Sequence, residues 1–232
     1  MLFLSLNLVQ VQGYSQFQAG LTFLPFTVLM ISIARFAGSL ADRYGPRLFL
    51  IVGPALTGTG FLILSLIKQT NGPADYWKTF FPGVLVVGFG MSLTVAPLTA
   101  AVMGSVSEAH AGTVSGVNNA MTRISNVFAN AIFGALAVLL FSSALKENIK
   151  PLQLDVKEKQ SIMAEAVNLG NAKVPAHIDT AHATVIEKSF HAGFIYAYSR
   201  ILHLSAYLGF FGALMSVIFI RNKAVKKLAV SD

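Results

Sequence analysis

Four polar side chains interrupt an apolar segment of this 232-residue sequence. Asn119, Arg123, Asn126 and Asn130 follow at intervals of four, three and four residues, which places them on one face of a helix. Such groups can bind a polar ligand, or they can hydrogen-bond neighbouring helices at about 1 kcal/mol per Asn. At membrane depth a charged Arg costs about 3 kcal/mol, so it should face protein, a water-filled cavity or the aqueous interface. The stripe predicts either a substrate route or interhelical contacts, and both interpretations stay open.

One histidine lies within a long apolar segment. His203 can exchange a proton near neutral pH and is kept as a candidate for proton transfer, with an anchoring role at the membrane interface as the alternative. Arg35 and Arg200 are assigned to the same interfacial role, because long cationic side chains can extend to water. None of the long apolar segments contains Asp or Glu.

Residues suited to nucleophilic or metal chemistry are sparse. There is no Cys, which excludes disulfides and thiolate metal sites. His110 near Glu108, and the grouping of His177, Asp179 and His182, are the candidates that an enzyme could use. The second grouping lies in a polar loop without supporting residues around it. We therefore expect no catalytic residue, no metal site and no enzymatic activity.

The composition indicates a membrane protein. Hydrophobic residues make up 54% of the chain and charged residues only 12%, with a mean hydropathy of +0.64. Soluble domains have about 25% charged residues, so a soluble fold of this size could not cover its surface. The net charge is +7, but no basic stripe lies on a soluble face, and nucleic acid is not expected as a partner.

Five segments are long and apolar enough to cross a bilayer, for which a helix needs about 20 residues. The predicted spans are about residues 21–41, 48–67, 81–103, 117–141 and 201–220, with a shorter apolar segment at 1–11. We interpret residues 1–11 as part of a first helix that is truncated at its start. The expected fold class is an all-α membrane protein, a six-helix transmembrane bundle over residues 1–232.

Residues 142–189 are predicted to form a long loop outside the cytoplasm. Apolar residues between Leu152 and Leu169 predict one amphipathic helix, and those between Ala181 and Ile186 predict a shorter one. An external lid is one interpretation of this loop. A cap lying on the membrane surface is the simpler one.

The basic residues near the span ends predict the orientation. One side of the predicted bundle has six of them: Arg43, Arg47, Arg221, Lys223, Lys226 and Lys227. The short loops of the other side have only Lys68 and Lys78. Because Lys and Arg concentrate on cytoplasmic loops, we expect a multi-pass protein of the cell (cytoplasmic, or inner) membrane with its C-terminus in the cytoplasm.

The turn at residues 38–47 carries the most specific pattern. Gly45 can take a backbone conformation that other residues avoid, and Asp42 lies near the positive end of the following helix. The pattern resembles the motif G-x-L-a-D-r-x-G-r-r/k of the major facilitator superfamily. The matching residues are Gly38, Leu40, Ala41, Asp42, Arg43, Gly45 and Arg47, with Pro46 in place of a basic residue. In that family the motif follows the second span of a six-helix half, and the resemblance implies a cytoplasmic latch that stabilises one access state.

Two further segments resemble a subgroup of that family, the fourteen-span drug:proton antiporters. They are residues 10–25 and the stretch from Leu98 through His110 to Ala120. The resemblance implies the last six of fourteen spans, one half of a major facilitator fold that exports amphipathic compounds by alternating access. A proton gradient rather than a cofactor would supply the energy, and the coupling carboxylate would belong to the other half.

The implied partners are the lipid bilayer, a small-molecule substrate, and an N-terminal transporter half or a second copy of this chain. A non-transporting remnant, or the assembly partner of a split transporter, is the alternative. A substrate route and contacts between helices both stay open as roles of Asn119, Arg123, Asn126 and Asn130.

Overall fold

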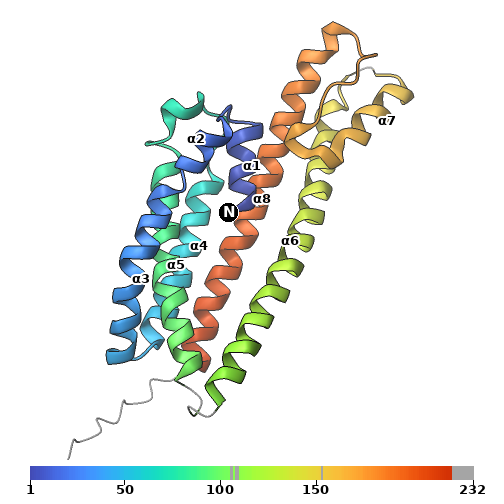
Figure 1. Cartoon of the computed structure of the whole chain (residues 1–232). Coiled ribbons are helices and arrows are strands. Elements are labelled where there is room, and N and C mark those ends of the chain that lie inside the picture. Colours follow the sequence, from blue (N-terminus) through green and yellow to red (C-terminus); the bar gives the residue numbers. More distant parts are fainter. Residues whose placement is uncertain (105–106, 108–109, 153, 221–232) are drawn as a thin grey trace, which may run out of the picture. The chain divides into compact units, whose positions relative to one another are not determined.

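The computed structural model describes residues 1–104, 107, 110–152 and 154–220, and over these residues the chain is helical without strands. Figure 1 shows α1 (Leu2–Gln10), α2 (Gln16–Leu21), α3 (Leu24–Tyr44), α4 (Arg47–Ser65), α5 (Phe80–Met103), α6 (Ala111–Ile149), α7 (Val156–Ala164) and α8 (Thr180–Phe219). Two 3-10 helices, η1 (Gly72–Asp75) and η3 (Glu165–Asn171), lie in the connections. The predicted all-helical fold is confirmed.

Five helical stretches of this part of the chain are long and apolar enough to cross a membrane. They are Gln16–Tyr44, Arg47–Ser65, Phe80–Met103, Ala111–Ile149 and His182–Phe219. Each contains one of the five full-length predicted spans or nearly coincides with it. The sixth predicted span corresponds to α1, which has nine residues. The arrangement of six spans as one transporter domain stays a prediction.

The two longest helices extend beyond the spans predicted from hydropathy. α6 continues to Ile149, and α8 begins at Thr180, so both ends of the predicted loop 142–189 are helical. These ends are too polar to be recognised as membrane spans. They nevertheless bury apolar side chains, among them Leu145 on α6 and Ile186 and Phe190 on α8. The second amphipathic helix predicted in the loop is the beginning of α8.

Contacts along the chain define two compact units. Unit 1 comprises Met1–Thr22, Leu64–Phe80 and Ile124–Leu204. Unit 2 comprises Phe23–Ile63, Phe81–Arg123 and the described residues from Ser205 onward. Since α4, α5, α6 and α8 cross the boundaries of these ranges, each of them contributes residues to both units.

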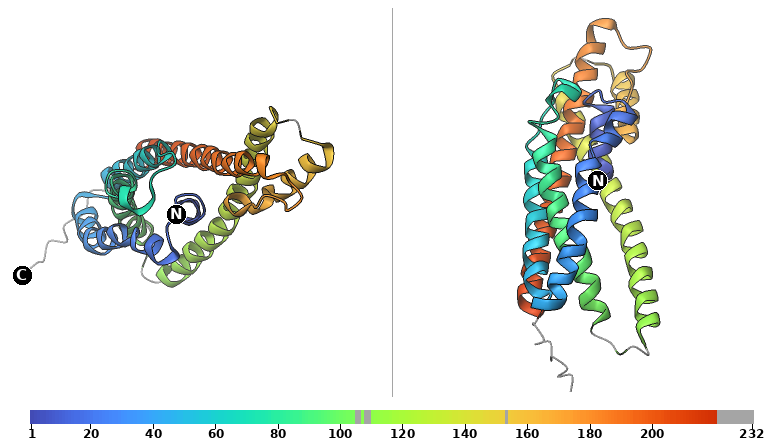
Figure 2. Two further views of the ribbon diagram at one scale, coloured as in Figure 1. Left: turned by 90° about the horizontal axis from the view of Figure 1, so that it is seen from above. Right: turned by 60° about the vertical axis from the view of Figure 1, so that its left-hand side comes forward.

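Unit 2 is held together by close approaches at glycine. A Cβ on Gly90 of α5 would lie 2.7 Å from the Gly53 carbonyl oxygen of α4, so these helices meet through their backbones. On the other side of α4, a Cβ on Gly209 of α8 would lie 3.2 Å from the Gly58 Cα. Gly88 of α5 similarly approaches α3. Small residues of this kind allow membrane helices to pack closely, and α3, α4 and α5 run side by side in both views of Figure 2.

Unit 1 contains a polar network that joins the segment after α1 to the segment after α4. The Gln12 Oε1 atom accepts hydrogen bonds from the Thr70 N–H at 2.8 Å and the Thr70 hydroxyl at 2.9 Å. Gln12 Nε2 donates to the Lys68 carbonyl at 3.1 Å, and the Tyr14 hydroxyl donates to the Gly72 carbonyl at 3.3 Å. One buried glutamine therefore satisfies three backbone or hydroxyl groups of a connecting loop.

The polar ends of α6 and α8 also belong to unit 1, and aromatic packing joins them. The Phe141 and Phe190 rings stack with centroids 6.4 Å apart. Nearby, α7 begins with a capping box in which the Asp155 N–H donates to the Glu158 carboxylate at 2.7 Å, and Ile162 of α7 is fully buried. These contacts explain why residues without membrane-span hydropathy form defined helices.

Candidate functional site

The turn between α3 and α4 depends on one glycine. α3 ends at Tyr44, and Gly45 follows with φ 90° and ψ 150°, a region that is essentially restricted to glycine. The Gly45 N–H donates to the Ala41 carbonyl at 2.8 Å and closes the last turn of α3. The Pro46 carbonyl then accepts from the Leu50 N–H at 3.0 Å in the first turn of α4. The prediction that Gly45 takes a conformation unfavourable to other residues is confirmed.

The charged residues of this turn lie at its surface and at a helix end. Asp42 and Arg43 are exposed, and the Arg43 guanidinium lies 5.5 Å from the Tyr44 ring centroid. Arg47 Nη2 donates to the Val217 carbonyl at 2.9 Å, in the last turn of α8. Carbonyls in that turn have no partner within the helix and carry partial negative charge, so the guanidinium is well placed there.

Gly38, the first residue of the motif, lies on the side of α3 that faces α5. A Cβ on Gly38 would lie 3.6 Å from the Ala96 Cβ, which is an ordinary contact. Among the described residues, Asp42 forms no ion pair with an arginine of the turn. The structure thus gives the turn a defined backbone and one anchored arginine, and the latch role of its charges stays a prediction.

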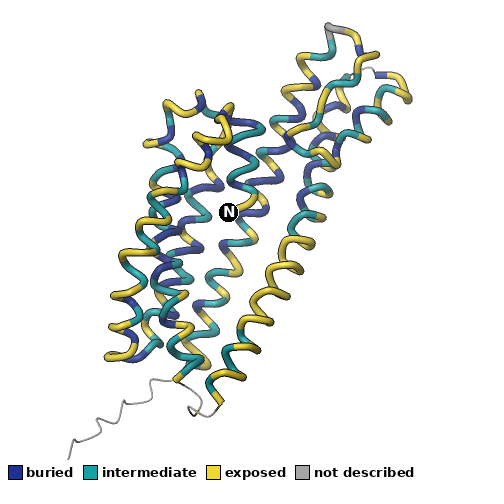
Figure 3. Tube along the Cα trace, in the orientation of Figure 1, coloured by how far each residue is buried: buried dark blue, intermediate teal, exposed yellow. Residues whose placement is uncertain are grey.

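The polar stripe lies on α6, which is an uninterrupted α-helix across it. Asn119, Arg123, Asn126 and Asn130 are all exposed, and their side chains form no hydrogen bond with the residues that the structure describes. The apolar side chains around them are exposed as well, and Figure 3 shows this stretch of α6 in the colour of exposed residues. Residues 119–132 are therefore exposed on every face with respect to the part of the chain that the structure describes.

His203 lies half-buried on α8 in unit 1. Its Nδ1 atom is 2.7 Å from the Ser199 carbonyl, so the neutral ring carries its proton on Nδ1 and leaves Nε2 as the basic nitrogen. The Ser199 hydroxyl in turn donates to the Ser65 carbonyl of α4 at 2.9 Å. This arrangement fixes the ring orientation, and the role of His203 in proton transfer stays a prediction.

Two of the histidines that enzyme chemistry could use contact serine hydroxyls. His177 Nε2 is 3.0 Å from the Ser161 hydroxyl, and His110 Nδ1 is 2.9 Å from the Ser107 hydroxyl, all at exposed positions. Glu108 lies outside the described residues. Over the part of the chain that the structure describes, no three His, Asp or Glu side chains are grouped so that they could hold a metal ion.

Sequence reasoning missed a buried polar cluster in unit 1. Asn7 of α1 is completely buried, and among the described residues its Nδ2 atom has no hydrogen-bond partner. The same holds for Gln10 Oε1 and the Tyr198 hydroxyl. Asn7 and Gln10 are polar residues within the apolar segment 1–11, and this pattern could have indicated buried polar contacts. The segment was not analysed for such contacts because it is short.

Tyr76 forms a second contact that the sequence analysis missed. Its hydroxyl donates to the Thr22 carbonyl at 2.8 Å and ties the loop after α4 to the end of α2. Burial raises the pKa of Tyr76 to about 12, and the nearby Tyr14 hydroxyl adds to the shift. Burial, together with the negative charge of Asp75, also raises the pKa of Tyr14.

The long apolar helices, the tight glycine-mediated packing and the glycine-dependent turn define a multi-pass helical membrane protein. A family model described as the Major Facilitator Superfamily matches residues 1–130, more than half of the sequence. The chain belongs to the major facilitator superfamily.

Several characterised proteins are similar to this chain. The multidrug resistance protein Stp of Mycobacterium tuberculosis H37Rv is 25% identical over 179 residues, which are 77% of this chain and 32% of Stp. The methyl viologen resistance protein SmvA of Salmonella typhimurium LT2 is 26% identical over 82% of this chain and 36% of SmvA. A probable actinorhodin transporter of Streptomyces coelicolor is 31% identical over 61% of this chain and 25% of its own length. The matched part of this chain thus corresponds to about a third, or less, of the length of these relatives. Their names denote resistance or transport, in line with a transporter rather than an enzyme.

Proposed function

We propose that this chain is the C-terminal six-span part of a membrane exporter that expels amphipathic compounds by proton-coupled alternating access. The observation that supports the proposal most is the α3–α4 turn, where Gly45 of the motif takes a glycine-only conformation in a chain that belongs to the major facilitator superfamily. The names of Stp and SmvA, which refer to multidrug and methyl viologen resistance, support export as the direction.

The turn suggests how the chain takes part in alternating access. Arg47 is anchored on the end of α8, whereas Asp42 and Arg43 are exposed and available to another helix end. We infer that these two charges interact with a neighbouring segment in one access state and release it in the other. Such a latch stabilises one access state because it forms contacts in that state that are absent in the other.

The exposed stretch of α6 is an argument that further membrane spans pack against this helix. An Arg and three Asn at membrane depth are costly against lipid, so this face should contact protein or a water-filled cavity. We propose that an N-terminal transporter half, or a second copy of this chain, covers it and that Asn119, Arg123, Asn126 and Asn130 line the substrate route between the halves.

The energy source in this proposal is the proton gradient. The predicted spans contain no carboxylate, so the proton-binding acid would belong to the other half, with His203 as the local candidate. The orientation proposed is multi-pass in the cytoplasmic membrane with the C-terminus in the cytoplasm, since the topology predicted from the sequence puts the basic residues of the turn and the tail on the same side.

The proposal is tested by efflux from intact cells. The chain is expressed from its native locus, with its neighbouring genes, in a strain that lacks other drug exporters. Cells loaded with ethidium are then energised, and the loss of fluorescence is followed with and without an uncoupler. Faster efflux than in the deletion strain, abolished by the uncoupler, is the expected result. Equal efflux in both strains would exclude export, and efflux that persists with the uncoupler would exclude proton coupling.

A further inference from the structure

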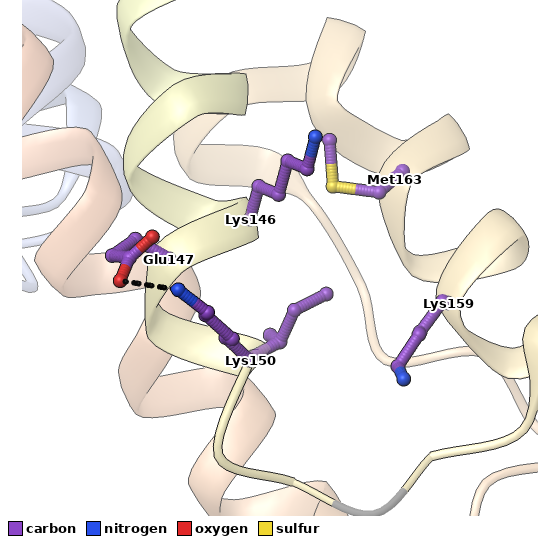
Figure 4. Close-up of a pocket in the computed structure, with 6 residues that line it drawn as sticks. Lys146, Glu147, Lys150, Lys159 and Met163 are labelled. Atoms are coloured by element: carbon purple, nitrogen blue, oxygen red, sulfur yellow. Dashed lines mark hydrogen bonds and ion pairs between the residues drawn. The ribbon is translucent and has the colours of Figure 1, made fainter.

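A positively charged cavity lies in unit 1, where the end of α6 faces α7. Its volume is about 690 Å³, within the range of about 300–1,000 Å³ that is usual for small-ligand sites. Figure 4 shows the side chains that line it: Lys146, Glu147 and Ile149 from α6, Lys150 directly after α6, and Lys159 and Met163 from α7. None of these residues belongs to the candidate transport site.

Positive charge dominates the lining of this cavity. Lys150 forms an ion pair with Glu147 at 3.5 Å, and both side chains are about three-quarters exposed. Lys146 and Lys159 form no ion pair with the residues that the structure describes. The nearby Glu158 carboxylate is occupied at the beginning of α7, where it accepts the Asp155 N–H. Two lysines are therefore available to a negatively charged ligand.

The cavity also offers apolar surface beside its lysines. The thioether of Met163 on α7 supplies this surface, whereas Ile149 lines the cavity at a position that is only 3% exposed. In Figure 4 the Lys146 side chain extends toward Met163, so a charged and an apolar group meet there, whereas the Lys159 ammonium group points away from them. A lining of this kind matches a ligand that joins an anionic group to an apolar chain.

The position of the lysines along α6 identifies the source of such a ligand. The span predicted from hydropathy ends at residue 141, and Lys146 follows about 7.5 Å further along the helix, at 1.5 Å per residue. The headgroup layer on each side of the hydrocarbon core is about 5–7.5 Å thick. By this placement of the predicted span, Lys146 lies at the outer edge of the phospholipid headgroup layer.

We propose that this cavity binds an anionic phospholipid, with the phosphate held by Lys146, an acyl chain along Met163, and Lys159 adding positive charge to the same cavity. The site depends on the placement of α6 in a bilayer and does not depend on transport activity. A loss of export would therefore leave this proposal intact, and the failure of lipid binding would leave the proposed transport function intact.

The test measures lipid binding to the purified chain in mild detergent by native mass spectrometry. The ligands are phosphatidylglycerol, phosphatidylcholine with the same acyl chains, and inorganic phosphate. The double variant Lys146→Gln/Lys159→Gln is compared with Lys157→Gln/Lys188→Gln, which removes the same charge at exposed positions that do not line the cavity. Each Lys near an anionic surface contributes about fivefold in affinity, so the cavity variant should bind phosphatidylglycerol about thirtyfold more weakly.

Three results would overturn the proposal. Equal affinity for phosphatidylcholine would mean that the lysines do not select an anionic lipid. Displacement of phosphatidylglycerol by inorganic phosphate would mean that the site is an anion site without a lipid chain. An equal loss of affinity in the control variant would mean that binding follows overall charge. The comparison of the two lipids uses the wild-type chain, so it stands even if a variant does not fold.

Discussion

The contact between α4 and α5 predicts a large effect from one added methyl group. In the variant Gly90→Ala the new Cβ would lie 2.7 Å from the Gly53 carbonyl oxygen and closer still to the backbone nitrogen and the hydroxyl of Thr57. An ordinary contact begins at 3.4 Å, so α4 and α5 would have to separate by at least about 0.7 Å. Overpacking of this kind costs about 1–3 kcal/mol. The partners are mainly backbone atoms, which cannot move away independently.

A matched variant isolates this packing cost from helix propensity. Alanine is about 1 kcal/mol better than glycine within a helix, and this gain applies to both Gly90→Ala and Gly116→Ala. A Cβ on Gly116 of α6 would have no atom of the described residues within 4 Å, so that variant receives the gain alone. Gly90→Ala should therefore be less stable than Gly116→Ala by about 1–3 kcal/mol.

The assay is reversible unfolding of the purified chain in mixed micelles with increasing SDS, followed by circular dichroism. The free energy of unfolding is compared among the wild-type chain and the two variants at one detergent composition. Equal stability of Gly90→Ala and Gly116→Ala would refute the close backbone approach of α4 and α5. A destabilised Gly116→Ala would show instead that α6 has a tight contact at that position.

Three further perturbations follow from the turn and from the loop contacts. Gly45→Ala should lower the free energy of unfolding by about 1–3 kcal/mol, because alanine is strained at φ 90° and ψ 150°; SDS unfolding measures the loss. Arg47→Gln should lower it by about 1.5 kcal/mol, since the charged hydrogen bond to Val217 is removed, and an unchanged value would contradict that contact. Tyr76→Phe should cost about 1 kcal/mol at pH 8 through the lost bond to Thr22. Because the folded-state pKa of Tyr76 is raised from 10 to about 12, its contribution is present below pH 10 and is lost as the pH rises toward 12; alkaline unfolding should therefore be flatter in the Phe variant.

The sequence predicted the fold class and most of the membrane helices because both depend on local hydropathy. It also predicted the special conformation of Gly45, since only glycine allows that backbone region at the end of α3. It did not predict the full length of α6 and α8. Their polar ends are helical because Leu145, Ile149 and Ile186 are buried against other parts of unit 1, and such contacts cannot be read from hydropathy.

In the candidate site too, features that depend on neighbouring residues were predicted, whereas contacts between distant residues were not. Helical periodicity was sufficient to place Asn119 and Asn130 on one face of α6. The bond from Arg47 to Val217 joins residues that are 170 positions apart, and no pattern near either residue indicates it. The Gln12 and Tyr76 contacts were missed for the same reason, because each joins a loop to a distant segment.

We propose that this chain takes part in proton-driven export controlled by the α3–α4 turn. The most direct measurement is ethidium uptake into inside-out membrane vesicles that contain the wild-type protein, Asp42→Asn, or Glu187→Gln as a control at an exposed position. We predict uptake that requires an imposed proton gradient, falls about tenfold in Asp42→Asn, and is unchanged in Glu187→Gln. Absence of gradient-dependent uptake in the wild-type vesicles would contradict the account, and equal uptake by Asp42→Asn would contradict the role of the turn.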